Sequence, residues 1–121
     1  MAVTADYRDY VLEQVARAGV VTTRRMFGAL GLYCDGLFFG LIDDDTLFFK
    51  AGETNRADYE SRGMRQFMPW PDKPDASKKM AYFEVPADVL EDAEQLVVWA
   101  GKSVAVALSA SYSKKPKARR R

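Results

Sequence analysis

The dipeptide Asp35-Gly36, set between two short apolar runs, is the feature that most restricts how this chain can fold. Asp-Gly favours the positive φ angles of a type I′ turn, which joins two antiparallel strands over two residues. The flanking runs, Leu32–Cys34 and Leu37–Ile42, are rich in residues that suit strands. This part of the sequence therefore predicts a β-hairpin.

Two further segments extend this hairpin into a larger sheet. The β-branched segment Val20–Met26 precedes it and predicts a strand. The apolar run Thr46–Lys50 follows three aspartates at positions 43–45, which interrupt the apolar pattern as turn-forming residues do. The region predicts an antiparallel meander of three or four strands, and five aromatic residues lie on it: Tyr33, Phe38, Phe39, Phe48 and Phe49.

Helical patterns surround the meander. Residues 4–18 carry apolar side chains at helical spacing, with Thr4 as the N-cap and Gly19 as the stop. Residues 54–62 predict a short helix, for which Thr54 is the expected cap.

The last third of the chain predicts an extended loop, a strand and a long helix. Three prolines make Phe67–Lys79 an extended loop, and Met80–Val85 predicts one more strand. Pro86 then begins a long amphipathic helix that continues to residue 108. The fold class is therefore α+β: an antiparallel meander sheet packed against an N-terminal helix and a long C-terminal helix. Residues 1–108 are expected to form the domain, and 109–121 a polar linker and a basic flexible tail.

The side chains that are missing exclude most enzyme templates. The chain has no histidine, which excludes His-based triads and His metal ligands. Its single cysteine, Cys34, excludes multi-cysteine zinc sites, and its neighbour Asp35 favours an unreactive thiol. The aspartates at 43–45 lack the further ligands of a calcium loop and are interpreted as a solvated turn. We expect no catalytic residues, no cofactor and no metal.

Three side chains are candidates for binding a protein partner: Arg24, Arg25 and Trp70. Adjacent arginines on a strand point to opposite faces, so we expect one of them at most to reach a shared site. There its planar guanidinium would hold a carboxylate or a phosphate. The alternative is an exposed arginine with a local salt bridge, and for Trp70 a plug that pins its own loop to the domain.

Charge is divided unevenly along the chain. Residues 114–121 hold six basic groups and no acid, whereas the other 113 residues hold 12 basic and 17 acidic groups. Flexible cations displace counterions from nucleic acid, so the tail predicts salt-sensitive DNA binding without sequence preference. The alternative is a solubilising tail without a dedicated partner. The tail cations are Lys114, Lys115, Lys117, Arg119, Arg120 and Arg121.

The sequence carries no membrane or export signal. No apolar run approaches the roughly 20 residues that span a bilayer. The N-terminus also lacks the basic-then-apolar pattern of a signal peptide. We therefore expect a cytoplasmic protein that does not bind membranes.

A set of short motifs carries a family resemblance. Arg-Met-Phe-Gly at 25–28 leads into Gly-Leu-Tyr-x-Asp-Gly at 31–36, and Leu-Phe-Phe-Lys at 47–50 and Met-Ala-Tyr-Phe-Glu-Val-Pro at 80–86 follow. Over roughly residues 5–108, this pattern resembles the TfoX/Sxy N-terminal domain family. The resemblance implies an α+β domain with no known enzymatic activity. The best-known members regulate DNA-uptake competence as coactivators of transcription alongside a cyclic-AMP receptor protein, and they carry a second, C-terminal domain. Here the resemblance implies a stand-alone N-terminal domain.

These observations favour a non-enzymatic regulatory adaptor that binds a protein partner, such as a transcription factor or RNA polymerase, while the tail assists at DNA. One alternative is a nucleic-acid-binding protein that acts mainly through its tail. Another is a small-molecule-binding domain or an unrecognised enzyme, with a pocket between the sheet and the last helix. Trp99 lies beside the apolar stripe of that helix and is a candidate to face a partner subunit, which leaves a homodimer open. The small residues of the helix would let another element approach closely; they are Ala100, Gly101, Ala105 and Ala107.

Overall fold

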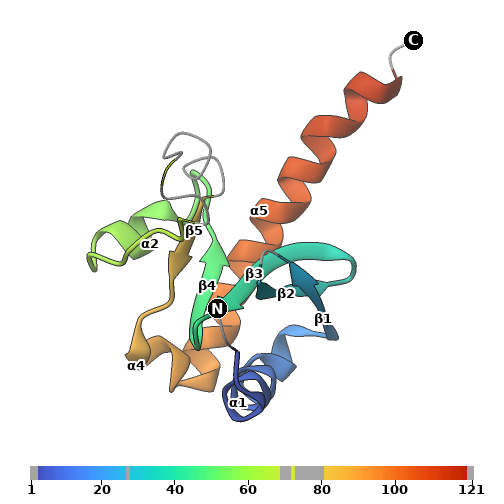
Figure 1. The fold of residues 1–121 in the computed structure, drawn as a ribbon. Helices are drawn as coiled ribbons and strands as arrows, with labels where there is room; N and C mark the ends of the chain where they lie inside the picture. The colour runs from blue at the N-terminus through green and yellow to red at the C-terminus, as the bar shows by residue number, and fades with distance from the viewer. Residues whose placement is uncertain (1–2, 27, 69–71, 73–80, 120–121) are drawn as a thin grey trace.

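The computed structural model describes residues 3–26, 28–68, 72 and 81–119 of the chain, with side chains as far as Ser111. The described strands form a five-stranded antiparallel sheet in the order β1-β2-β3-β4-β5 (Figure 1). Each strand therefore pairs with its neighbour in the sequence, as in the predicted meander. The strands are β1 Val21–Met26, β2 Ala29–Cys34, β3 Leu37–Asp43, β4 Thr46–Lys50 and β5 Tyr82–Glu84.

Two hairpin turns of the meander, those between β2 and β3 and between β3 and β4, use the same backbone conformation. Asp35 and Gly36 have φ angles of 52° and 81°, as a type I′ turn between β2 and β3 requires. Asp44 and Asp45 have φ angles of 52° and 50° between β3 and β4. The predicted hairpin is confirmed, and the aspartate triplet makes a second tight turn, because aspartate tolerates the left-handed region better than most residues.

Helices cover one face of this sheet. These are α1 (Ala5–Val15), the 3₁₀ turn η1 (Ala16–Ala18), α4 (Ala87–Leu90) and α5 (Ala93–Arg119). The main core lies between them and the sheet, where apolar side chains of α1, β3, β4 and α5 are fully buried. Figure 1 shows α5 crossing behind the sheet and extending beyond it. The α+β class is confirmed, with both predicted helices on the sheet.

The short helix α2, Arg56–Glu60, begins later than predicted and is capped differently. Asn55, not Thr54, occupies the N-cap position, and its side chain makes no cap hydrogen bond. The Asn55 amide is used elsewhere: it accepts from the Gly52 amide at 2.7 Å and donates to the Lys50 carbonyl at 3.1 Å. The turn before α2 therefore depends on Asn55, and the prediction for Thr54 is wrong.

The long helix predicted from Pro86 is divided in two. α4 ends at Leu90, and α5 begins at Ala93 after the acidic pair Glu91 and Asp92. The Asp92 carboxylate accepts from the Glu94 and Gln95 amides at 3.1 and 3.3 Å, which is N-cap geometry. A residue that caps a new helix competes with continuation of the old one, so the helical apolar spacing alone cannot reveal this break.

At its other end, α5 is longer than predicted. It continues through residues 109–113, where the sequence predicts a polar linker. Alanine and serine tolerate helical conformation, and extending an existing helix costs far less than nucleating one. The helix therefore continues past residue 108, while the division of the chain there into a domain and a polar linker with a basic tail stays a prediction.

Candidate interaction surface

The sheet face that points away from the core carries a second apolar cluster. Its buried members come from the strands and from Phe67: Ala29, Leu41, Phe48, Phe67 and Tyr82. The strand register explains this separation, because side chains alternate between the two faces. Leu41 pairs with Phe48, whereas their neighbours Gly40 and Phe49 pair on the core side. The described helices contribute no buried residue to this second cluster.

Three aromatic rings form a continuous row on this face. Tyr33 of β2 stacks on Phe38 of β3 with 5.2 Å between the ring centroids. Phe38 in turn lies 5.1 Å from the ring of Tyr82, on β5. These spacings lie within the favourable range for aromatic pairs, so the three rings support one another. Tyr33 and Phe38 stay half-exposed, whereas Tyr82 is buried.

Cations lie at both ends of this row. The Arg24 guanidinium lies 5.8 Å from the Tyr33 centroid, and the Lys50 ammonium lies 5.1 Å from that of Tyr82. Both distances fit cation–π interactions. We call these five side chains, Arg24, Tyr33, Phe38, Lys50 and Tyr82, the ring–cation surface. It offers aromatic faces and positive charge side by side.

Burial further disfavours ionisation of the Tyr82 hydroxyl, which is already neutral at physiological pH when its pKa is the ordinary one. Desolvation raises the pKa of Tyr82 well above its ordinary value, and the charge of a Tyr33 phenolate would raise it further. Tyr82 therefore remains a phenol at physiological pH, and the positive charge of Arg24 and Lys50 is not cancelled by a phenolate there.

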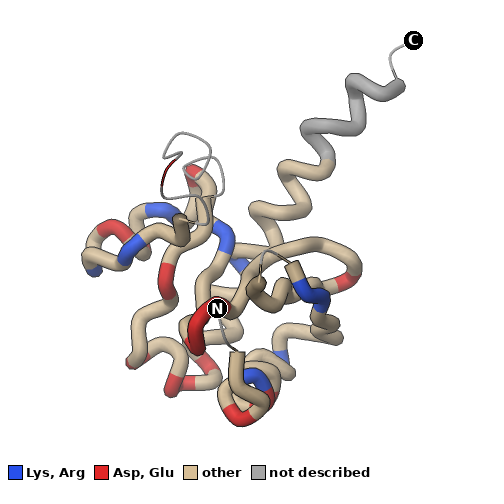
Figure 2. Tube along the Cα trace, viewed as in Figure 1, with Lys and Arg blue, Asp and Glu red and all other residues tan. Residues whose placement is uncertain are grey.

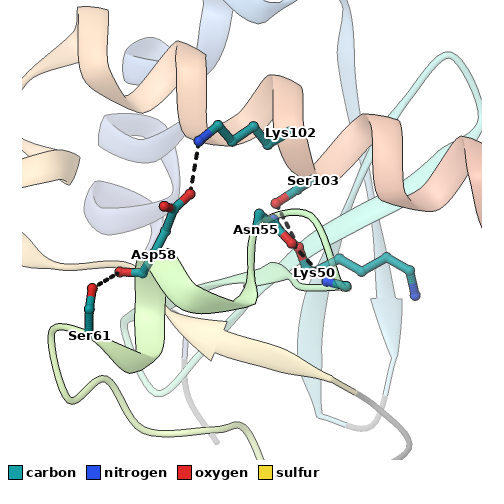
Figure 3. Close-up of polar contacts among 7 residues, drawn as sticks. Lys50, Asn55, Asp58, Ser61, Lys102 and Ser103 are labelled. Atoms are coloured by element: carbon teal, nitrogen blue, oxygen red, sulfur yellow. Dashed lines mark hydrogen bonds and ion pairs between the residues drawn. The ribbon is translucent and has the colours of Figure 1, made fainter.

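A polar junction fixes the end of β4 that carries Lys50 (Figure 3). The Lys50 carbonyl accepts from the Ser103 hydroxyl of α5 at 2.8 Å and from the Asn55 amide at 3.1 Å. Beside it, the Lys102 ammonium contacts the Asp58 carboxylate at 3.0 Å and so ties α5 to α2. One strand end, one loop and one helix therefore set the position of the Lys50 backbone.

Two shallow pockets lie along the C-terminal part of α5. One, of about 320 Å³, lies beside the ring–cation surface and is lined by strand residues that include Phe38, Lys50 and Tyr82 and by Ala107, Ala110 and Ser111 of α5. The other, of about 390 Å³, lies between residues 52–54 and α5. Each is lined by one charged side chain, Lys50 or Glu53, so neither gathers the converging polar groups of a typical ligand site.

The two arginines predicted to bind a partner do not come together. Arg24 pairs in register with Gly31 and joins the ring–cation surface, whereas Arg25 pairs with Leu30, whose side chain packs against the main core. Both arginines are exposed, on opposite faces of β1, as strand alternation predicts. Trp70 and the side chains of the six tail cations lie outside the described residues.

Trp99 packs against residues of its own chain. Its ring makes an edge-to-face contact with Tyr59, with 4.9 Å between the centroids, and the Arg62 guanidinium lies 5.5 Å from the Trp99 centroid. Tyr59 is fully buried, so this contact belongs to the packing of α2 against α5. Trp99 is partly buried by this packing, and the suggestion that it faces a partner subunit stays a prediction.

Negative charge gathers at one end of the molecule, where the turn at 43–45 lies near α1 and α4 (Figure 2). The Asp45 carboxylate accepts from the Thr4 amide at 2.8 Å and from the Thr4 hydroxyl at 3.0 Å, which ties this turn to the start of α1. Among the described residues, no group of three or more acidic or cysteine side chains is placed to hold a metal ion. None of the helices described there combines the length and the apolar character needed to cross a bilayer.

Comparison with known families gives one match. The family model of the TfoX N-terminal domain matches residues 13–107, which is more than three quarters of the chain. This range begins within α1 and ends within α5, so it includes the whole sheet. No curated protein matches the chain. The protein belongs to the TfoX N-terminal domain family.

Proposed function

We propose that this protein is a non-enzymatic regulatory adaptor of the cytoplasm that binds a protein partner through the ring–cation surface. The observation that carries the proposal is the row of three rings with a cation at each end. Membership of the TfoX N-terminal domain family supports a regulatory role. The partner we propose is a transcription factor or RNA polymerase, bound through an acidic or aromatic patch.

The chemistry of the surface suits protein recognition. Tyrosine and arginine are enriched among the residues that dominate binding energy at protein interfaces. The rings of Tyr33 and Phe38 are already packed against each other, so binding would cost them little conformational entropy. Arg24 is exposed and carries a planar guanidinium that can donate two hydrogen bonds to a partner carboxylate.

A pair of charge reversals tests this proposal. Purified RNA polymerase and a cyclic-AMP receptor protein would each be titrated against the immobilised full chain, and dissociation constants measured by biolayer interferometry. For the partner that binds, Arg24→Glu should weaken binding by about tenfold or more, since it reverses the charge beside Tyr33. Arg25→Glu is the matched control on the opposite face and should leave affinity nearly unchanged.

Two results would contradict the proposal. Binding of neither partner to the wild-type chain would remove the adaptor role for both. An equal loss of affinity in Arg24→Glu and Arg25→Glu would show that the ring–cation surface is not the contact. Circular dichroism of both variants checks that the fold is intact.

The basic tail favours a second activity, DNA contact, which is part of the same proposal. Six cations within eight residues provide a dense positive charge for a phosphate backbone. Fluorescence anisotropy with duplex DNA would compare the wild-type chain with a variant in which all six become glutamine. The wild type should bind with a log–log salt slope of up to about −5, and the variant should not bind. Equal binding by both chains would exclude the tail as the contact.

A further inference from the structure

The outward side of α5 carries an apolar stripe. Val98 and Leu108 have 58% and 41% of their surface exposed, and Gly101 and Ala105 between them are also exposed. Spacings of three, four and three residues place these four on one side of a helix. We call Val98, Gly101, Ala105 and Leu108 the α5 stripe. The opposite side of α5 is buried in the main core through Leu96 and Ala100, so the helix is apolar on both sides. An ordinary surface helix is polar on its outer side.

Packing within the described part of the chain does not explain Gly101. A Cβ atom built there meets none of the described residues within 4 Å, so this packing does not require a glycine at position 101. A glycine inside a helix costs up to about 1 kcal/mol relative to alanine. What glycine does allow is close approach of another backbone from outside. The open space over Gly101 therefore suits a second helix.

The α5 stripe is symmetrical about Ser103. When two copies of α5 run antiparallel with Ser103 level with its counterpart, Val98 lies opposite Leu108 and Gly101 lies opposite Ala105. The larger residues then face each other at the ends, and the small ones face each other at the centre. Such a surface is complementary to itself under a twofold axis, as a symmetric dimer interface requires.

Charge supports the same orientation. α5 begins beside Glu91, Asp92 and Glu94, and its helix extends past Lys114 and Lys115. In the antiparallel register, the acidic start of one copy is level with the basic part of the other. A parallel pairing would instead place acid beside acid and base beside base, which is repulsive.

We propose that two copies of this chain form a homodimer by antiparallel packing of their α5 stripes. The inference does not rest on the ring–cation surface, because the α5 stripe lies on the outer side of the helix layer. Binding to a transcription partner could fail while the dimer forms, and the reverse also holds.

The first test is the mass of the full chain in solution, measured by light scattering after size exclusion over a range of concentrations. The expected mass is twice 13.6 kDa. Gly101→Leu should weaken the dimer by about tenfold or more, because it fills the closest approach. The same change leaves the monomer intact, since the added atoms meet open space and leucine favours helix. Val20→Glu, at an apolar residue with 75% exposure outside α5, is the control and should leave the mass unchanged.

The second test fixes the orientation. In the antiparallel register, residue 98 of one copy faces residue 108 of the other. The double variant V98E/L108K therefore puts opposite charges together and should remain dimeric, whereas V98E/L108E should become monomeric. In a parallel register, both variants would place like charges together. A monomeric wild type at every concentration overturns the dimer, and loss of the dimer in both double variants overturns the antiparallel register.

Discussion

Asn55 and Ser103 are buried polar side chains, with 1% and 0% of their surface exposed, and both bind the carbonyl of Lys50. A buried polar group is tolerated when its hydrogen bonds are made and becomes costly when a partner is removed. Asn55 also accepts from the Gly52 amide, so it satisfies one more backbone group than Ser103 does. The position of Lys50 on the ring–cation surface therefore depends on two buried residues that are not themselves part of that surface.

This difference predicts unequal losses of stability. Asn55→Ala should lower the free energy of unfolding by about 1–3 kcal/mol, because the Gly52 amide loses its acceptor and the Lys50 carbonyl loses one donor. Ser103→Ala should cost about 1 kcal/mol or less, since Asn55 still donates to the same carbonyl and alanine favours helix. Urea denaturation of both variants measures the two values. A larger loss for Ser103→Ala would contradict the assignment of Asn55 as the principal link.

The contact between Arg62 and Asp88 should make the stability of the fold depend on pH in the acidic range. Hydrogen bonding from the Arg62 guanidinium, whose Nη1 lies 3.0 Å from each Asp88 carboxylate oxygen, holds the pKa of Asp88 below its ordinary value. A lowered folded-state pKa stabilises the fold above the ordinary pKa, and this stabilisation is lost as the pH falls through the folded value. The wild type should therefore lose more stability than Asp88→Asn between about pH 4 and pH 2. Carboxyl titration by NMR measures the pKa directly, and an Asp88 pKa at or above the ordinary value would refute the prediction.

At the scale of elements, local sequence predicts the hairpins well and the helix boundaries poorly. The turn at Asp35-Gly36 can be predicted from these two residues alone, because both favour the positive φ angles that the turn needs. The break between α4 and α5 has a different origin. It depends on which amides Asp92 caps, and the helical apolar spacing continues unchanged across it. The α2 start likewise depends on the tertiary bonds of Asn55 to Lys50 and Gly52, which the sequence around Thr54 does not contain.

The turn between β3 and β4 gives a prediction at this scale. Asp44 and Asp45 have nearly the same φ angle, but Asp45 also binds the amide and hydroxyl of Thr4. Asp44→Gly should change the free energy of unfolding by less than about 1 kcal/mol, since relief of the left-handed backbone offsets the added chain entropy. Asp45→Gly should destabilise by about 1–3 kcal/mol more, because the N-terminus of α1 loses its anchor. Thermal unfolding followed by circular dichroism compares the two, and equal losses would show that the Thr4 contact contributes nothing.

At the scale of the whole molecule, the sequence predicts part of the ring–cation surface. It does not predict which residues the sheet brings together there. Strand alternation predicts that Arg24 and Arg25 separate, and the structure places only Arg24 beside Tyr33. Tyr82 could not be assigned to the same row, because it follows Phe38 by more than 40 residues and reaches it only when β5 pairs with β4. The surface is a product of sheet order, which short motifs do not encode.

The separation of charge between the acidic domain and the basic tail is also a property of the whole molecule. Ala107 is the last residue of α5 buried in the described part of the chain. Removing residues 114–121 should therefore change the free energy of unfolding by less than about 0.5 kcal/mol, because the buried side chains that the structure describes on α5 all precede residue 108. The same removal takes six basic groups from a chain of net charge +1 and leaves a net charge of −5. Urea denaturation at dilute, monomeric concentrations should give equal midpoints for both chains in low and high salt. A lower midpoint for the shortened chain in low salt alone would show that the tail binds the acidic end of its own domain, because screening would abolish that attraction.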